Sequence, residues 1–341
     1  ERPTIRGPLN GVTVIDFSRL LPGPLATKIL AEKGAKVIKV ESPASPDYIR
    51  NFPPFINNTA AYHLGLNANK HSLALDYTMD EGRDLIYKLV KQADVFVEQF
   101  RPGVMESLGL GYDALSTINP KLVYVSITGY GQKGEQSQTA GHDLNYMAEA
   151  GLLQHESGTP YVPLFQAADV TGGSYRTAME VMFALWQLRQ TGKGRHVDIA
   201  MSEAVMPLAT LPYWHTKAGG NESFALAGEM ANYTVYACKD DKWVALAALE
   251  PKFWEAFCEM VGRPQWKGRL LDTGKQMQQL KQEVAELFKT KTRADWLAIA
   301  ENKEVCLSPV LTMHDVVADE SKTIHFEGST HWQAPELGED N

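Results

Sequence analysis

Short β-branched, apolar runs alternate with amphipathic stretches in the N-terminal part of the chain. Residues 12–17 form such a run, which predicts a strand. A helix is predicted from Pro22 to Lys33, where Gly34 ends it, and residues 37–41 predict the next strand. This strand–helix–strand order with short connections is typical of parallel pairing. Further strands are predicted at residues 72–76, 94–97 and 122–127.

These strands and the helices between them predict an α/β fold with a Rossmann-like open, mostly parallel sheet. Ligands of such sheets gather at the carboxyl ends of the strands. No Gly-x-Gly-x-x-Gly motif follows the first strand, so a nicotinamide dinucleotide is not expected. The irregular, Pro- and Asn-rich residues 42–66 are predicted to be a long functional loop.

The pattern changes in the second half of the chain. Residues 174–189 predict a long helix with four large apolar side chains facing inward: Met179, Met182, Phe183 and Trp186. After a strand at 196–200, a β-hairpin over 233–248 and amphipathic helices predict a smaller α+β domain. We expect a large domain formed by 1–200 with 320–341, a linker at 201–224, a small domain at 225–312 and a return linker at 313–319.

Composition limits the classes of function. A formal net charge of −8 excludes an extended basic surface for nucleic acid. No segment reaches about 18 unbroken apolar residues, and the N-terminus lacks a signal-peptide core, so no membrane association is expected. Cys238, Cys258 and Cys306 are far apart and are expected to be buried and reduced, in a cytoplasmic protein. No zinc-ligand spacing occurs, so no metal site is expected.

Acid–base chemistry is concentrated between Gly129 and Ser174. His142 and Asp169 each lie in a glycine-containing run, and Asp169 precedes the long apolar helix, whose N-terminus can stabilise an anion. Each has a structural alternative: His142 could be a capping or solvated residue, and Asp169 an N-cap. Asp143 could form an Asx-turn, and Glu250 could cap a helix or orient an imidazole.

Four cations are candidates for binding an anionic ligand. Arg19, Lys39 and Arg101 follow or end predicted strands on one edge of the sheet, and Lys70 precedes another strand. The alternative for each is an ordinary solvated surface charge.

The chain resembles the class III CoA-transferase (CaiB/BaiF-like) family, which includes α-methylacyl-CoA racemases. The resemblance covers nearly the whole length in several blocks that occur in the family's order. These are residues 9–17, 22–24, 34–41, 67–70, 100–103, 128–131, 192–194, 249–253 and 335–339.

The resemblance implies a large Rossmann-like domain built from both chain ends, a smaller domain, and two chains interlocked as a homodimer. It also implies that the large domain binds CoA as part of an acyl-CoA thioester substrate, with no permanently bound cofactor. Arg19, Lys39, Lys70 and Arg101 are the CoA contacts that it implies.

Two chemistries compete within the family. In the transferases, the residue matching Asp169 attacks the thioester, giving an anhydride and then an enzyme–CoA thioester. In the racemases, the residues matching His142 and Asp169 are bases on opposite faces of the α-carbon, and the residue matching Glu250 orients the histidine. The run from Gly141 to Tyr146, which includes Asp143, resembles the racemase form.

A racemase acting on a 2-methylacyl-CoA is therefore the preferred interpretation. It requires burial to raise the pKa of Asp169 so that this carboxyl can return a proton. A CoA-transferase is the alternative, and a CoA-ester-binding protein without turnover is the third.

Overall fold

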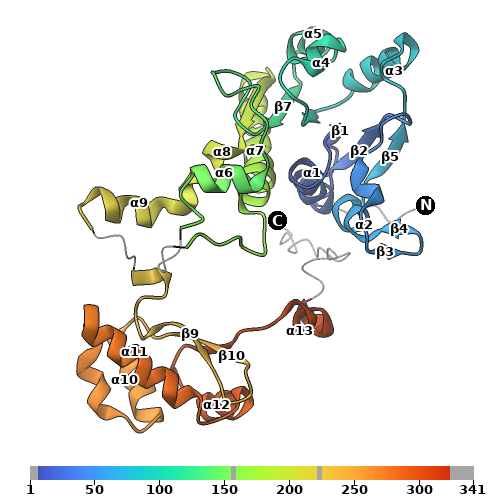
Figure 1. Ribbon diagram of the computed structural model, residues 1–341. Helices are drawn as coiled ribbons and strands as arrows, with labels where there is room; N and C mark the ends of the chain where they lie inside the picture. Colours follow the sequence, from blue (N-terminus) through green and yellow to red (C-terminus); the bar gives the residue numbers. More distant parts are fainter. Residues whose placement is uncertain (1–6, 155–158, 221–224, 323–341) are drawn as a thin grey trace, which may run out of the picture. The chain divides into compact units, whose positions relative to one another are not determined.

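The computed structural model describes residues 7–154, 159–220 and 225–322, and they divide into two compact units (Figure 1). The first unit contains residues 7–153 and 162–209 of the described chain. The second contains residues 154, 159–161, 210–220 and 225–322. The two units meet in sequence between Ala209 and Thr210, within residues 201–224, where a linker was expected.

The first unit is built on a six-stranded sheet whose strands are all parallel. Its strands are β1 (Thr13–Asp16), β2 (Lys36–Glu41), β5 (His71–Ala74), β6 (Val95–Glu98), β7 (Val123–Thr128) and β8 (Arg195–Ala200). They lie in the order β5-β2-β1-β6-β7-β8. Counted along the chain, this is the 3-2-1-4-5-6 order of dinucleotide-binding folds. The predicted Rossmann-like parallel sheet is confirmed, and its order reverses between β1 and β6.

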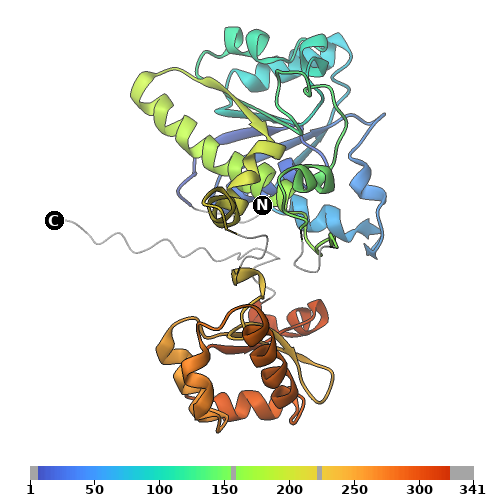
Figure 2. The ribbon, with the colours of Figure 1, turned by 60° about the vertical axis from the view of Figure 1, so that its left-hand side comes forward.

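Successive strand residues feed two hydrophobic cores, one on each face of the sheet. Val14 belongs to one core and its neighbour Ile15 to the other, as the period of two in a strand requires. The first core is covered by α1 (Pro22–Glu32), α6 (Asp143–Glu149) and α7 (Arg176–Thr191). The second is covered by α3 (Asp80–Val90), α4 (Val104–Ser107) and α5 (Tyr112–Ile118). Figure 2 shows the strands between these two groups of helices.

Helix α1 has the boundaries that the sequence predicts. Pro22 is at its first position, where a missing N–H costs no hydrogen bond. Lys33 is its C-cap, and Gly34 follows with φ +95°, a left-handed conformation that favours glycine.

Helix α7 presents a different face to the core from the one predicted. Its buried residues are the smaller ones, among them Ala178, Val181 and Ala184, which let the helix pack closely on the sheet and on α1. The four large side chains that were expected inward are instead exposed: Met179 (43%), Met182 (43%), Phe183 (56%) and Trp186 (62%). The prediction was wrong because α7 is apolar on more than one side, and periodicity alone does not identify the side that meets the sheet.

The segment expected to be an irregular loop contains regular structure. Residues 48–67 form η1 (Tyr48–Asn51), the short strands β3 (Phe55–Ile56) and β4 (Thr59–Ala60), and α2 (Ala61–Asn67). After β8, the described part of the first unit ends with α8 (Met201–Ala204) and η3 (Met206–Ala209).

The second unit is α+β, as predicted, with a three-stranded antiparallel sheet in the order β11-β10-β9. The predicted hairpin is β9 (Tyr233–Ala237) and β10 (Trp243–Ala247), and β11 is Leu307–Pro309. The helical segments are α9 (Thr210–Lys217), η4 (Ala225–Ala227), α10 (Pro251–Met260), η5 (Pro264–Arg269), α11 (Gly274–Phe288), α12 (Arg293–Ala300) and α13 (Met313–Ala318).

The cysteines only partly follow the expectation. Cys238 and Cys258 are buried, but Cys306 is exposed. Cys306 has φ +48° and directly precedes the edge strand β11. Among the described helices, none combines the length and the apolarity needed to cross a bilayer.

Candidate active site

A pocket of about 490 Å³ lies at the carboxyl ends of β1, β6 and β7. Leu20 and Pro22 line it after β1, the segment 99–102 after β6, and Gly129 after β7. This is the point at which the strand order reverses, where open α/β sheets bind their ligands. His142 and Asp169 both line this pocket, which we call the first pocket.

His142 is fixed by the start of α6. It is the N-cap residue of this helix, and its backbone N–H donates to Oδ1 of Asn145 at 3.1 Å. The alternative that His142 caps a helix is therefore correct for its backbone. Its side chain is exposed and lines the first pocket, so the structural and the chemical roles coexist.

Tyr146 holds the two glycine runs of the site together. Its hydroxyl donates to the carbonyl oxygen of Gly141 at 2.6 Å. A Cβ atom at Gly129 would lie 2.4 Å from that hydroxyl, and one at Gly141 would lie 2.8 Å from the ring. Only glycine fits at both positions, because the ring occupies the space between the two backbone segments.

Asp169 lies within the first turn of a π-helical segment, η2 (Ala168–Tyr175), that continues into α7. The N-cap alternative for Asp169 is therefore wrong, because the helix starts before it. Asp143 caps this turn instead: its Oδ1 accepts the backbone N–H groups of Ala168 at 2.7 Å and Asp169 at 3.0 Å. The Asx-turn alternative for Asp143 is replaced by this longer-range contact, and Asp169 itself lines the pocket.

The carboxyl of Asp169 has a strongly raised pKa. Burial, followed by repulsion from the Asp143 carboxylate, raises the pKa of Asp169 to about 7. Burial also raises the pKa of Asp143, although the two N–H groups that it accepts oppose this. Asp169 therefore has both protonation states available at neutral pH, as the two-base interpretation requires.

Close packing on α1 fixes the η2 segment. Ser174 donates its hydroxyl to the carbonyl oxygen of Pro22 at 2.7 Å. A Cβ atom at Gly173 would lie 2.5 Å from Cβ of Pro22, so glycine is required for this approach. The backbone that carries Asp169 is thus tied to the helix that follows β1.

Of the four predicted cations, Arg101 lines the first pocket and Arg19 lies against a residue that lines it; we call these two the rim of the first pocket. Arg101 is exposed and lines it. The guanidinium of Arg19 lies 5.0 Å from the ring centre of Phe100, another lining residue, and donates to the carbonyl oxygen of Ser45 at 3.1 Å.

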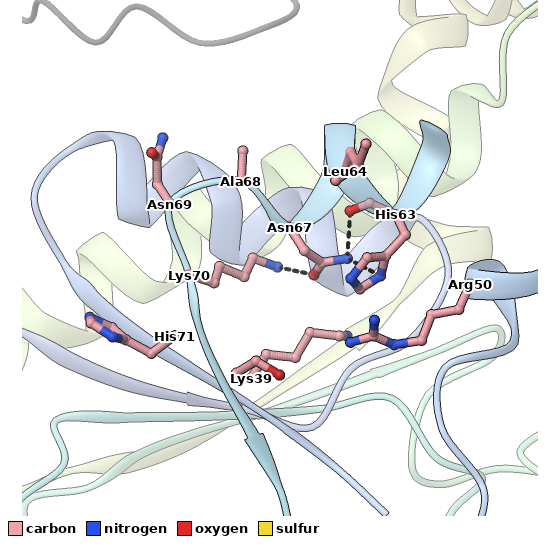
Figure 3. A pocket seen from close by; sticks show the side chains of 10 residues that line it. Lys39, Arg50, His63, Leu64, Asn67, Ala68, Asn69, Lys70 and His71 are labelled. Atoms are coloured by element: carbon pink, nitrogen blue, oxygen red, sulfur yellow. Dashed lines mark hydrogen bonds between the residues drawn. The ribbon is translucent and has the colours of Figure 1, made fainter. Parts of the chain in front are cut away.

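Lys39 and Lys70 line a separate, second pocket of about 270 Å³ (Figure 3). The solvated-surface alternative is wrong for both, because each side chain is only 2% exposed. Lys39 pairs with Asp47 at 3.3 Å and Lys70 with Asp16 at 3.1 Å. Burial, opposed by the Asp16 charge, lowers the pKa of Lys70 to about 8.

Sequence reasoning assigned no role to Tyr146 in the first pocket, or to Arg50 and His63 in the second. The glycines at 129 and 141 were the only sequence signal for Tyr146, because its ring leaves no room for a side chain at either position. Arg50 pairs with Glu41, and His63 contacts the Asn67 amide through Nδ1 at 3.2 Å. Both lie in the segment that was predicted to be irregular, so no periodicity indicated them.

Glu250 belongs to the second unit. It is the exposed N-cap residue of α10 and makes no side-chain capping bond. The helix-cap alternative therefore holds for its backbone only, and its pairing with His142 stays a prediction.

The sequence and structure match known proteins along nearly the whole chain. Residues 9–339 match the model of CoA-transferase family III. The chain is 34% identical to human alpha-methylacyl-CoA racemase over 91% of this chain and 79% of that protein. It is 31% identical to human succinyl-CoA:glutarate CoA-transferase over 97% of this chain and 78% of that protein.

A crystal structure of a CaiB/BaiF family protein from Brucella suis superimposes with a TM-score of 0.80. The two are 30% identical, and the match covers 93% of this chain and 88% of that one. With the family's sequence blocks, the parallel sheet and these matches together, the chain belongs to CoA-transferase family III.

Proposed function

We propose that the protein is an acyl-CoA racemase that inverts the α-carbon of a 2-methylacyl-CoA. The observation that carries this proposal is that the imidazole of His142 and the carboxyl of Asp169 line one pocket, with the pKa of Asp169 raised to about 7. A two-base reaction needs one neutral base and one protonated acid at the same pH. Asp169 can provide the protonated acid near neutrality.

The reaction moves one proton from carbon and returns another. His142 removes the α-proton, and the electron pair passes to the thioester oxygen to give an enolate. Protonated Asp169 then donates its proton to the opposite face of the α-carbon. In the reverse direction the two residues exchange roles. Helix α6 starts directly after His142, and the positive end of its dipole favours the enolate charge.

Coenzyme A enters this proposal as part of the substrate. We assign its phosphates to Arg19 and Arg101, because both lie at the rim of the first pocket. Lys39 and Lys70 line the second pocket instead. There Lys70 donates to Asp16, Pro24 and Asn67, and Lys39 donates to Ser18 and Asp47. We therefore give these two lysines a supporting role in shaping the second pocket.

A homodimer is part of the proposal. The exposed apolar face of α7, with Phe183 at 56% and Trp186 at 62% exposure, is a surface that a second chain would cover. In the interlocked arrangement that family membership implies, Glu250 would orient the imidazole of His142 from the second unit.

A CoA-transferase is the alternative, supported by the 31% identity to succinyl-CoA:glutarate CoA-transferase and by the place of Asp169 in the lining of the first pocket. The presence of His142 in the same pocket favours the racemase, since the transferase reaction needs the carboxyl of Asp169 but no imidazole. The racemase is therefore preferred.

The test is incubation of a 2-methylacyl-CoA of one configuration with the protein in heavy water. A racemase incorporates deuterium at the α-carbon, and His142→Ala abolishes the incorporation. Transfer of CoA to a free acid, with hydroxylamine trapping at Asp169, would contradict this and support the transferase. Binding of the thioester with neither reaction would support a binding protein without turnover.

A further inference from the structure

Glu98 is a buried carboxyl at the end of β6, directly behind the first pocket. Glu98 is only 3% exposed to solvent. The charges that act on it come from Glu106 and Asp198, which are themselves acidic. A buried carboxylate among other carboxylates is costly, so its hydrogen bonds must account for its presence.

One of these bonds fixes the pocket wall. Oε2 of Glu98 accepts the backbone N–H of Phe100 at 2.8 Å. The ring of Phe100 is the surface over which the Arg19 guanidinium lies, and the next residue is Arg101. The intervening Gln99 accepts the backbone N–H of Gly23 with its side-chain oxygen at 3.0 Å, which ties the same turn to α1.

On its other side, Glu98 is connected to two further polar side chains of the sheet. Ser126, its partner in register on β7, hydrogen-bonds the Glu98 carboxyl. The Ser126 hydroxyl lies 2.9 Å from Nε2 of His196 on β8. His196 stacks on Tyr112 with ring centres 5.1 Å apart, which fixes the imidazole in place.

We propose that Glu98 is a positioning residue for CoA binding: backed by Ser126 and His196, its carboxylate holds the backbone of Phe100 and, through it, the Arg19 and Arg101 rim of the first pocket. This inference rests on the proposed function, since it assigns CoA to that rim. Glu98 touches neither the substrate nor the reacting atoms.

The positioning depends on the charge of Glu98. Burial, which outweighs the hydrogen bonds from Ser126 and Phe100, raises the pKa of Glu98 to about 7. A carboxylate binds an N–H more strongly than a neutral acid does. Phe100 is therefore held firmly above about pH 7 and more loosely below it.

Several other titratable groups act on His196, which lies next to Ser126 behind Glu98. Burial lowers the pKa of His196, against the nearby carboxylates Asp198, Glu106 and Asp113, while Lys133 acts in the same direction as burial. Burial thus moves the titration of His196 to lower pH, away from the pH range in which Glu98 changes its charge.

The first test needs no ligand. In the full chain labelled with ¹⁵N-phenylalanine, the Phe100 amide resonance, assigned by its loss in Phe100→Leu, should move with a midpoint near pH 7. Glu98→Gln keeps an oxygen that can accept the N–H but cannot titrate, so the movement should disappear. Ser126→Ala removes a bond that stabilises the carboxylate, so the midpoint should rise. A static resonance, or one that moves equally in Glu98→Gln, would overturn the inference.

The second test is CoA affinity by equilibrium dialysis, in an Asp169→Asn background so that this carboxyl does not contribute. Relative to its parent, Glu98→Ala should bind CoA about tenfold more weakly above neutrality, the worth of one charge-assisted hydrogen bond. Glu98→Gln should restore the affinity and show less weakening on acidification than the parent. Equal affinities in all three proteins would disprove the coupling to the pocket. If the parent binds no CoA, the proposed function fails, whereas the Phe100 titration still decides whether Glu98 holds the turn.

Discussion

Oδ1 of Asp143 accepts the backbone N–H of Asp169 at 3.0 Å, so the residue next to His142 caps the turn that carries the second candidate base. The same oxygen accepts the N–H of Ala168 at 2.7 Å. The Asp143 carboxylate therefore sets the position of Asp169 relative to His142, although the two are far apart in sequence. It also raises the pKa of Asp169 by its charge, after the larger effect of burial.

Asp143→Asn separates these two effects. The amide oxygen can still accept both N–H groups, but the charge is lost, so the pKa of Asp169 should fall. Protonated Asp169 then becomes scarcer at neutral pH, and the alkaline limb of deuterium incorporation should move to lower pH. Asp143→Ala, as a comparison, leaves two donors without their acceptor and should cost about 1–2 kcal/mol of stability. An unchanged alkaline limb in Asp143→Asn would contradict this account.

The raised pKa of Asp169 also predicts a pH-dependent stability. A carboxyl whose pKa rises from 3.8 to about 7 on folding favours the folded state when protonated. That contribution is complete below about pH 4 and is lost as the pH rises through 7. Asp169→Asn should therefore raise the melting temperature at about pH 8 and change it little at about pH 4. Thermal unfolding at both pH values checks this, and an equal shift at both would refute it.

The buried Lys70–Asp16 pair should be important for stability. Lys70→Met leaves the fully buried Asp16 without its closest cation and should cost about 3–5 kcal/mol in the free energy of unfolding. Adding Asp16→Asn should recover part of this loss. The control is Arg83→Met, which breaks a pair whose Asp80 side chain is 87% exposed and should cost less than about 1 kcal/mol. Denaturant unfolding would compare them, and similar losses in the two single variants would contradict the assigned roles.

Gly173→Ala tests the packing of η2 on α1. The new methyl group would lie 2.5 Å from Cβ of Pro22, so η2 must shift and carry Asp169 with it. Deuterium incorporation at saturating substrate should fall by about 10²-fold, because small misplacements of catalytic groups are costly. Gly65→Ala is the matched control, since a Cβ there meets nothing within 4 Å. Full activity in Gly173→Ala would show that the position of Asp169 tolerates this shift.

Co-expression of two inactive variants tests the proposed dimer. If Glu250 of one chain orients His142 of the other, a mixed dimer of His142→Ala and Glu250→Ala contains one intact site. Random pairing then gives about a quarter of wild-type activity, although each variant alone is inactive. Recovery near zero, with mixed dimers detected by differential tags, would mean that the two residues act within one chain.

The sequence predicted the sheet because β-branched runs such as residues 12–17 report directly on strand formation. It also predicted the end of α1, since Gly34 adopts the left-handed conformation that stops a helix. Burial was harder to predict. Nothing local marks Lys70 as buried, because its partner Asp16 is 54 positions away. The inward face of α7 was misjudged for a related reason, as close packing on the sheet selects small residues such as Ala178 over large ones.

The sequence predicted the two candidate catalytic residues of the site, but not the contacts that hold them in place. His142 and Asp169 were identified from their types and their glycine neighbours, and the pocket contains both. The cap that Asp143 provides across 25 positions, and the burial that raises the pKa of Asp169, exist only in the folded chain.

The ring of Tyr146, packed between Gly129 and Gly141, limits how the substrate range of this protein could be redesigned. Any side chain added at either glycine would collide with that ring. A designer who wants a differently shaped acyl site must therefore begin with a smaller residue at 146 and only then add bulk at 129 or 141. The three positions must therefore be changed together. Libraries that randomise them one at a time would miss the combinations of side chains that pack without a collision.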